Sequence, residues 1–230
     1  MKKKLLLMGL ILVTITLVGC TYKYVNPDRV KFKEDYESLN GETSNSGKEY
    51  RVLAVPTDHP YTYTTVDDLN KMIENKESFI AYFGANWCPW CRSMLLTSID
   101  KANEHNIEKI YYVDVRPDNI INNDIRDIYS KDENGKIYLS HRGTDAYKKF
   151  TNSLKDILKD YKAGDITLEG TEFEGEKRIG APTFIMVKNG KGVTITNGVS
   201  PEQTDAYMDL NIAIYNDMEK MFDEFFSLYK

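Results

Sequence analysis

The stretch from Phe83 to Cys91 constrains the fold and chemistry of this 230-residue chain more than any other. It reads Phe-Gly-Ala-Asn-Trp-Cys-Pro-Trp-Cys, so two thiols separated by two residues follow directly on a hydrophobic run. Such a pair can exchange with disulfides, bind zinc together with other ligands, or close a structural disulfide. The chain has only three cysteines, at positions 20, 88 and 91, which leaves none for a disulfide framework. This favours thiol redox chemistry at Cys88 and Cys91.

Zinc binding is the weaker interpretation of the cysteine pair. A zinc site usually takes four ligands, and the three histidines, His59, His105 and His141, stand far from ligand spacing to the thiols. The chain also has no glycine-rich phosphate loop and no convincing Ser-His-Asp pattern. The sequence therefore predicts neither a metal nor a cofactor.

The first 20 residues have the three-part build of a secretory signal. Lysines at positions 2–4 precede an apolar run over residues 5–18 that is short for a transmembrane helix. The last four residues, Leu-Val-Gly-Cys, resemble the lipobox of bacterial lipoproteins, whose cysteine is acylated on sulfur and begins the mature protein. The resemblance implies a signal peptide over 1–19 and a lipid anchor on Cys20. The alternative is an uncleaved signal anchor.

Either reading places the rest of the chain outside the cytoplasm, on a membrane surface, where disulfides persist. The net charge of −5 becomes more negative once the lysines at 2–4 are removed, which argues against a nucleic-acid partner. Abundant Lys, Asn, Ile and Tyr are typical of an AT-rich genome and, with the lipobox, point to a Gram-positive bacterium. The expected partners are exported protein thiols or disulfides and a membrane redox partner.

The remaining chain divides into a linker and one domain. Residues 20–49 are polar with little apolar periodicity, and this pattern predicts a flexible tether. Residues 50–230 are enough for a single hydrophobic core with an insertion.

Strand and helix patterns alternate along this domain. The apolar run at 78–83 predicts a buried strand that leads into the cysteine pair at a helix start. Asn189-Gly190 between two β-rich runs, 183–187 and 193–196, is a hairpin signal. Ser200, Pro201 and Gln203 predict the start of a C-terminal helix. Further expected elements are strands over 50–55, 109–115 and 137–139, and helices that open at Thr65 and Thr144.

Three local matches resemble the thioredoxin family. Residues 85–92 are similar to its WCxxC signature with a basic residue after the second cysteine, and residues 179–184 to the loop whose cis-proline faces the cysteines. Residues 184–191 are similar to the strand and turn that follow. The resemblance covers residues 78–115 and 179–228. It implies a thioredoxin-like α/β fold with a central mixed sheet flanked by helices.

This placement assigns a role to each thiol. A cysteine at a helix N-terminus has a lowered pKa, so Cys88 is expected to be the nucleophile, and Cys91, one turn further and less exposed, to resolve the mixed disulfide. Pro89 suits the first helical turn. The resemblance further implies that Pro182 follows a cis bond and that the backbone of Ala181 hydrogen-bonds a bound peptide.

Trp87 and Trp90 flank the thiols. They are expected to form an apolar docking surface for an extended substrate segment, the alternative being that both are packing residues.

Tyr82 departs from the thioredoxin pattern. Many thioredoxins carry a buried acid six residues before the first cysteine, as a proton acceptor for the resolving thiol, and here that position is Tyr82. Either another acid, such as Glu108 or Asp114, assists Cys91 through water, or deprotonation is less efficient.

The second departure is a long insertion at about 116–178. Within it, apolar residues recur at helical spacing from Thr144 to Tyr161, with Gly164 as a C-terminal stop. Insertions at this point lie near the active-site face, so substrate selection or partner docking is one interpretation, and structural decoration of the sheet edge is the other.

Two classes of function follow. The favoured one is a membrane-anchored thiol-disulfide oxidoreductase, as a reductase or an oxidase, since the Pro89-Trp90 dipeptide does not decide the direction. The alternative is a thioredoxin-like accessory or adaptor lipoprotein that acts mainly by partner binding, similar to bacteriocin-transport accessory proteins.

Overall fold

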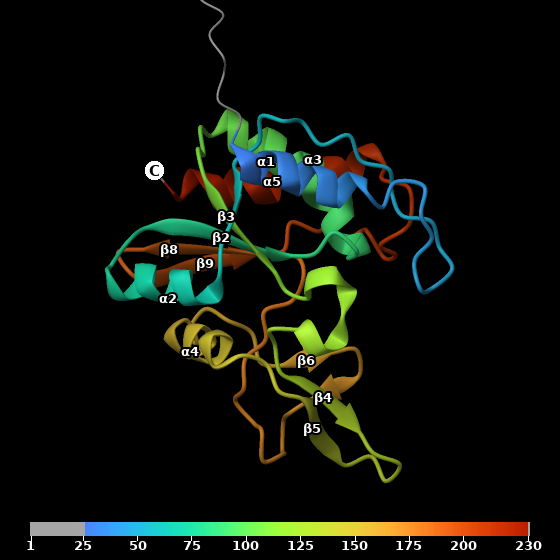
Figure 1. Cartoon of the computed structure of the whole chain (residues 1–230), viewed down its shortest axis with the longest axis vertical. Coiled ribbons are helices and arrows are strands. Elements are labelled where there is room, and N and C mark those ends of the chain that lie inside the picture. The colour runs from blue at the N-terminus through green and yellow to red at the C-terminus, as the bar shows by residue number, and fades with distance from the viewer. Residues whose placement is uncertain (1–25, 230) are drawn as a thin grey trace, which may run out of the picture.

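The computed structural model of the chain describes residues 26–229 (Figure 1). The predicted signal peptide and the lipid anchor at Cys20 lie outside these residues. Within the described part, none of the helices combines the length and the apolar character needed to span a bilayer.

A five-stranded mixed sheet forms the centre of the molecule, with the strand order β1-β3-β2-β8-β9. β1, β3 and β2 run parallel, whereas β8 is antiparallel to both β2 and β9. The strands are β1 (Tyr61–Tyr63), β2 (Phe79–Gly84), β3 (Ile110–Asp114), β8 (Thr183–Lys188) and β9 (Lys191–Thr196).

Five helices of the described chain cover the two faces of this sheet. α1, α3 and α5 lie on one face, and α2 and α4 on the other (Figure 1). Their bounds are α1 (Pro27–Glu37), α2 (Val66–Glu74), α3 (Pro89–Glu104), α4 (Asp145–Ser153) and α5 (Ile212–Ser227). The expected α/β class, a mixed sheet flanked by helices, is thereby confirmed.

β2 is the core strand, and all six of its residues are buried. It lies between β3 and β8 with helices on both faces, so its sequence is continuously apolar rather than alternating. Tyr82 stacks on its cross-strand neighbours Tyr112 and Phe184, at ring-centroid distances of 5.4 and 4.5 Å. On the opposite face, Phe83 packs against Phe150 of α4 at 5.4 Å.

Local signals placed most elements correctly. The hydroxyls of Thr65 and Thr144 cap α2 and α4 by accepting the N–H groups of Asp68 and Tyr147, both at 3.1 Å. The β8–β9 hairpin turns at Asn189-Gly190, where both residues have positive φ, 52° and 71°. A primed hairpin turn requires this conformation.

The prediction of a flexible tether up to residue 49 is wrong for the described part of that segment. Residues 27–37 form α1, which begins with Asn26 accepting the N–H of Asp28 at 3.0 Å and Pro27 in the first turn. Phe32 and Tyr36 are fully buried, and Phe32 stacks on Tyr61 at 4.5 Å. Two aromatic residues four apart share one helix face, which is enough to dock an otherwise polar helix.

The predicted start of the C-terminal helix is also wrong. α5 begins after Asn211, whose side chain accepts the N–H of Ile214 at 3.0 Å. Ser200 instead forms a local turn: its hydroxyl accepts the N–H of Glu202 at 3.1 Å and donates to Asp217 at 2.6 Å. The same residues that cap a helix also stabilise turns, because they bond nearby backbone in both cases.

Two further elements differ from expectation. Residues 50–55, expected as a strand, belong to no strand in the described chain. The helix that opens at Thr144 ends at Ser153, although Leu158 and Tyr161 beyond it are still buried.

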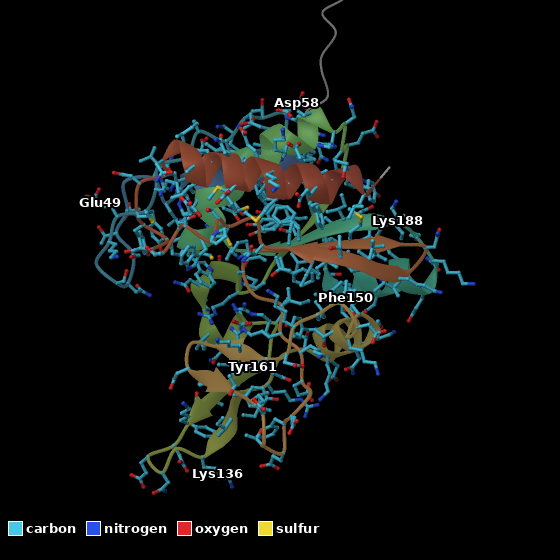
Figure 2. All side chains as sticks on the ribbon, turned by 180° about the vertical axis from the view of Figure 1, so that it is seen from behind. Glu49, Asp58, Lys136, Phe150, Tyr161 and Lys188 are labelled. Atoms are coloured by element: carbon cyan, nitrogen blue, oxygen red, sulfur yellow. The ribbon has the colours of Figure 1, made fainter. Side chains whose placement is uncertain are left out.

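Much of the insertion forms a small lobe beside the sheet. It contains the hairpin β4 (Ile128–Lys131) and β5 (Ile137–His141), the short pair β6 (Lys162–Ala163) and β7 (Ile166–Thr167), and two 3-10 turns, η1 (Pro117–Asn119) and η2 (Ile121–Asn123). Tyr129, Tyr161 and Leu168 form a separate hydrophobic cluster here. Figure 2 shows Tyr161 within the lobe and Lys136 near the outer end of its hairpin.

The packing of α1 predicts a large stability effect at Phe32. We expect Phe32→Ala to lower the free energy of unfolding by about 3–5 kcal/mol, since a fully buried ring is lost and its cavity remains. Val52→Ala, at a side chain that is 70 % exposed, is the control and should change it by less than about 0.5 kcal/mol. Urea denaturation measures both. Equal, small effects would show that α1 does not belong to the core.

Candidate functional site

The two thiols lie at the start of α3, directly after β2. Cys88 is the N-cap of the helix, and its Sγ accepts the N–H of Cys91 at 3.4 Å. The Cys88 thiol also donates to the carbonyl oxygen of Ala181 at 3.3 Å. The Ala181–Pro182 bond is cis, as expected. Cys88 is 5 % exposed and Cys91 is fully buried, and both are free thiols.

The surroundings of Cys88 favour its thiolate. Burial raises the pKa of the Cys88 thiol, but hydrogen bonds from the Cys91 side chain and from the backbone N–H groups of Cys91 and Trp90 outweigh it. The positive charge of Arg126 acts in the same direction, so the pKa ends below its ordinary value. Cys88 is therefore the thiol suited to nucleophilic attack.

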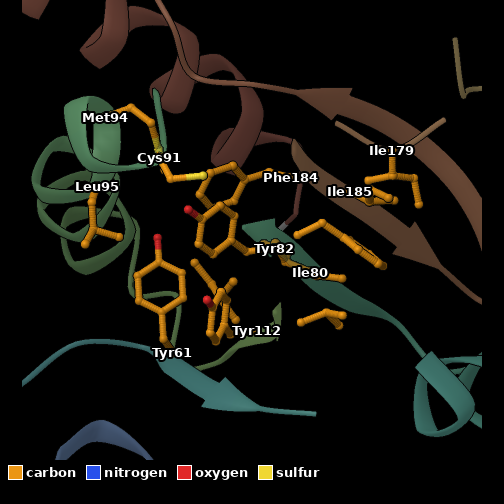
Figure 3. Packing of buried hydrophobic residues seen from close by; sticks show 14 of the residues in the cluster. Tyr61, Ile80, Tyr82, Cys91, Met94, Leu95, Tyr112, Ile179, Phe184 and Ile185 are labelled. Atoms are coloured by element: carbon orange, nitrogen blue, oxygen red, sulfur yellow. The ribbon is translucent and has the colours of Figure 1, made fainter. Parts of the chain in front are cut away.

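Cys91 has the opposite character. Burial, and then the hydrogen bond to Cys88 and its charge, raise the pKa of the Cys91 thiol well above the usual range. A hydrogen bond with the Tyr82 hydroxyl opposes this increase. Figure 3 shows the Cys91 sulfur turned toward the rings of Tyr82 and Phe184. The two environments thus move the pKa values of the two thiols in opposite directions. This difference distinguishes Cys88 as the attacking thiol from Cys91 as the thiol that remains protonated.

Tyr82 is linked in turn to α1. The hydroxyls of Tyr82 and Tyr36 lie 3.1 Å apart in a hydrogen bond, and both side chains are fully buried. When Cys91 ionises, the Tyr82 hydroxyl can donate to its sulfur while the Tyr36 hydroxyl donates to Tyr82. Two hydroxyls thus stand in series behind the buried thiol.

Arg92 holds this part of the site together. Its guanidinium, 1 % exposed, donates to the carbonyl oxygens of Tyr36 at 2.6 Å, Arg51 at 2.6 Å and Asn86 at 3.2 Å. It also donates to Oδ1 of Asn40 at 2.9 Å. No carboxylate pairs with it in the described chain, so the buried charge is stabilised by these oxygen dipoles and by the ring of Tyr50, whose centre lies 5.5 Å from the guanidinium carbon. α1, the loop before β1 and α3 are joined at this one side chain.

The predicted substrate-binding residues do not all lie together. Trp90, Ala181 and Pro182 line one hollow of about 630 Å³. Trp87 lines a different hollow, where its indole donates to the carbonyl of Arg116 at 3.1 Å. Pro89 occupies the first turn of α3 and is half-buried.

The two acids considered as substitutes at the Tyr82 position lie elsewhere. Asp114 lines a hollow with Asp35, Lys31 and Tyr63, and Glu108 lines another with residues of the segment before β1. The hydrogen-bonding group next to Cys91 is the Tyr82 hydroxyl itself.

Residues 26–229 contain no group of three His, Cys, Asp or Glu side chains arranged to hold a metal ion. The histidines are engaged elsewhere. His59 contacts the carbonyl of Arg29 at 3.0 Å, His105 contacts Asp223 at 2.9 Å, and His141 contacts the carbonyl of Asp124 at 2.8 Å.

Tyr36, Arg126 and Arg178 were missed as parts of the site. For Tyr36 a signal was present, because Asn26-Pro27-Asp28 is a helix-start sequence and an aromatic residue follows at the spacing of one helix face. Arg126 is held by Asp124, with an N···O distance of 2.8 Å, and its nearness to Cys88 depends on how the insertion folds.

Comparison with known proteins adds no relative. No protein-family model matches the chain, and no curated protein or solved structure matches it. Its function is therefore inferred from the geometry of its own side chains.

The Tyr82 hydroxyl makes a specific prediction for the Cys91 thiol. In a Cys88→Ser background, Tyr82→Phe should raise the pKa of Cys91, because the hydrogen bond that favours its thiolate is lost while the ring packing is kept. Tyr61→Phe is the matched control, since Tyr61 is equally buried but its hydroxyl bonds Ser98 at 2.6 Å. The pH dependence of alkylation measures the pKa. An unchanged value in Tyr82→Phe would contradict this role.

Asp114 predicts a pH dependence of stability. Burial, followed by the charges of Asp35 and Asp118, raises the pKa of its carboxyl to about 6. The hydrogen bond from the backbone N–H of Arg116 acts in the opposite direction and lowers this pKa. The unfolded chain loses this proton near pH 4, so folding is favoured below that pH and the benefit is lost as pH rises through about 6. In Asp114→Asn, the free energy of unfolding should fall less between pH 4 and 6 than in the parent. Parallel curves in denaturation experiments would contradict the assignment.

Proposed function

We propose that this protein is a thiol-disulfide oxidoreductase with a thioredoxin-like fold. The observation that carries the proposal is the placement of Cys88, a helix N-cap thiol with a lowered pKa, 3.3 Å from the carbonyl of Ala181 at a cis-proline. The strand order β1-β3-β2-β8-β9 and the helices on both faces support the fold assignment.

The reaction balances with the two thiols alone. The Cys88 thiolate attacks one sulfur of a substrate disulfide, its S–S bond breaks, and the released sulfur takes a proton. Cys91 then loses its proton and attacks Cys88 in the mixed disulfide, the bond between Cys88 and the substrate breaks, and the departing substrate thiolate takes up one proton. Two electrons pass from the dithiol to the substrate, and the protein keeps a Cys88–Cys91 disulfide. The reverse sequence oxidises a substrate dithiol.

Tyr82 and Tyr36 serve the second step. The proton of Cys91 must leave a site with no exposed surface, and the pKa of its thiol is well above the usual range. The Tyr82 hydroxyl stabilises the developing thiolate by a hydrogen bond, and Tyr36 supports Tyr82. This replaces a carboxylate with a neutral donor, so the thiolate is favoured without a second buried negative charge.

The substrates proposed are exported proteins, with a membrane redox partner that regenerates the dithiol. This part is supported by the signal-like sequence of the first 20 residues and by the lipobox-like sequence at Cys20, which favour a site on the extracytoplasmic face of a membrane.

An adaptor role is the second candidate, and the insertion favours it. The β4–β5 hairpin belongs to a lobe with its own hydrophobic cluster, and Tyr138 and Leu139 on β5 are 46 % and 37 % exposed. A cellular phenotype that survives Cys88→Ser would favour this role over redox chemistry.

Trapping experiments test the oxidoreductase proposal. Cys91→Ser should accumulate a mixed disulfide with a peptide disulfide, because attack by Cys88 remains but resolution is lost. Cys88→Ser, which also keeps one thiol, is the matched control and should form no adduct within the same time. Mass spectrometry detects the adduct. Equal trapping by both variants, or by neither, would refute the assigned roles. The reduction potential of the wild-type pair then decides between reductase and oxidase.

A further inference from the structure

The hollow beside the thiols combines an apolar part with a charged wall. Its apolar side comes from Trp90 next to the thiols, from Pro182, and from residues of β9 and the following loop. The insertion contributes five further lining residues, Leu158, Lys159, Asp160, Lys162 and Arg178. A volume of about 630 Å³ is enough for several side chains of an extended peptide.

The charged wall is positive. Lys159, Lys162 and Arg178 line the hollow, and Asp160 is the one acid among the lining residues of the described chain. Asp160 pairs with Lys177 at 2.6 Å, outside that lining. Lys159 and Lys162 are exposed, and no carboxylate pairs with either in residues 26–229. This is a local excess of positive charge on a chain whose net charge is −5.

Arg178 is held in a fixed position on this wall. Its guanidinium donates to the Tyr161 hydroxyl at 2.6 Å and lies 4.9 Å from the centre of the Tyr161 ring. Its backbone N–H bonds the carbonyl of Lys159 at 3.3 Å. Burial, with a contribution from Arg126, lowers the pKa of Arg178, so a carboxylate beside it would relieve an unfavourable charge. No carboxylate of the described chain forms an ion pair with Arg178, and Asp124, which acts on it at longer range, is already bound by Arg116 and Arg126.

Gln203 provides a second independent sign of a ligand. It lines the same hollow and is 4 % exposed, and its Oε1 has no hydrogen-bond partner. A buried acceptor without a partner is costly, and the N–H of a peptide backbone in the hollow would satisfy it.

From these features we infer that the hollow binds an extended segment of the protein substrate that carries aspartate or glutamate close to its reactive cysteine. The substrate cysteine meets Cys88, apolar side chains contact Trp90 and Pro182, and the acidic side chain faces Lys159, Lys162 and Arg178. This inference rests on the proposed oxidoreductase function. It makes the insertion the part of the molecule that selects the substrate.

Two matched peptide disulfides test the inference on the full-length protein. Both carry the same cysteine and apolar residues, each joined to 2-mercaptoethanol, and they differ only in acidic or basic residues beside the cysteine. The reduced protein should react with the acidic peptide about tenfold faster at low salt, with the difference shrinking as salt screens it. Rates are followed by chromatography of the released peptide thiol.

Charge reversal in the hollow should remove this preference. Lys159→Glu with Lys162→Glu is expected to lower the rate for the acidic peptide by about tenfold and to raise the rate for the basic one. Lys136→Glu with Lys220→Glu makes the same change in net charge on exposed residues outside the hollow, and it should keep the parental preference. Circular dichroism checks that both variants fold.

The outcomes separate the two proposals. Equal rates for the two peptides, or the same loss of preference in the control variant, would overturn the acidic-substrate inference while disulfide exchange itself remains. No reaction with either peptide or with oxidised glutathione, beyond that of Cys88→Ser, would overturn the oxidoreductase function on which it rests.

Discussion

The buried guanidinium of Arg92 is the interaction on which the arrangement around the thiols depends. An ion removed from water without a counter-ion is costly unless its hydrogen bonds are made, and here five donors meet oxygen atoms from four residues. Because those oxygens belong to α1, to the loop before β1 and to the segment between β2 and α3, the charge is satisfied only when all three segments are in place. Arg92, which follows Cys91 in sequence, therefore makes the geometry of the thiol site depend on the packing of these three segments.

The protonation of Cys91 depends on the same segments. Arg92 donates to the carbonyl of Tyr36, the Tyr36 hydroxyl bonds that of Tyr82, and the Tyr82 hydroxyl in turn favours the thiolate of Cys91 by lowering its pKa. A buried carboxylate could accept the proton of Cys91 outright, but until it did so it would be a negative charge buried beside the thiol, which is costly away from water. Two tyrosine hydroxyls supply donors without that charge, and their rings contribute to the core through stacking on Tyr112 and Phe184. α1 is thus a structural part of the proposed active site as well as of the core.

The parts that sequence could predict are those set by local interactions. The strand that leads to Cys88, the caps at Thr65 and Thr144, and the Asn189-Gly190 turn follow from neighbouring residues, and the structure has them where expected. α1 was missed because its polar composition hides an apolar face of only two buried residues, Phe32 and Tyr36. Ser200 was misread because a cap and a turn use the same side-chain bond. The hydroxyl partner of Cys91 and the positive wall of the hollow arise from residues far apart in the chain, which only the tertiary fold brings together.

Under the proposed function, the fold separates the disulfide exchange from the selection of its substrate. The thiols, Tyr82 and Pro182 lie on the central sheet and α3, where close packing fixes their distances, whereas Lys159, Lys162 and Arg178 belong to the insertion. The small cluster of Tyr129, Tyr161 and Leu168 stabilises that lobe, and Tyr161 in turn positions Arg178. We therefore expect substitutions in the lobe to change which disulfides react with Cys88 and to leave undisturbed the hydrogen bonds that set the thiol pKa values. Arg126 is the exception, since it lies in the insertion yet lowers the pKa of Cys88, so the lobe also contributes one charge to the reaction itself.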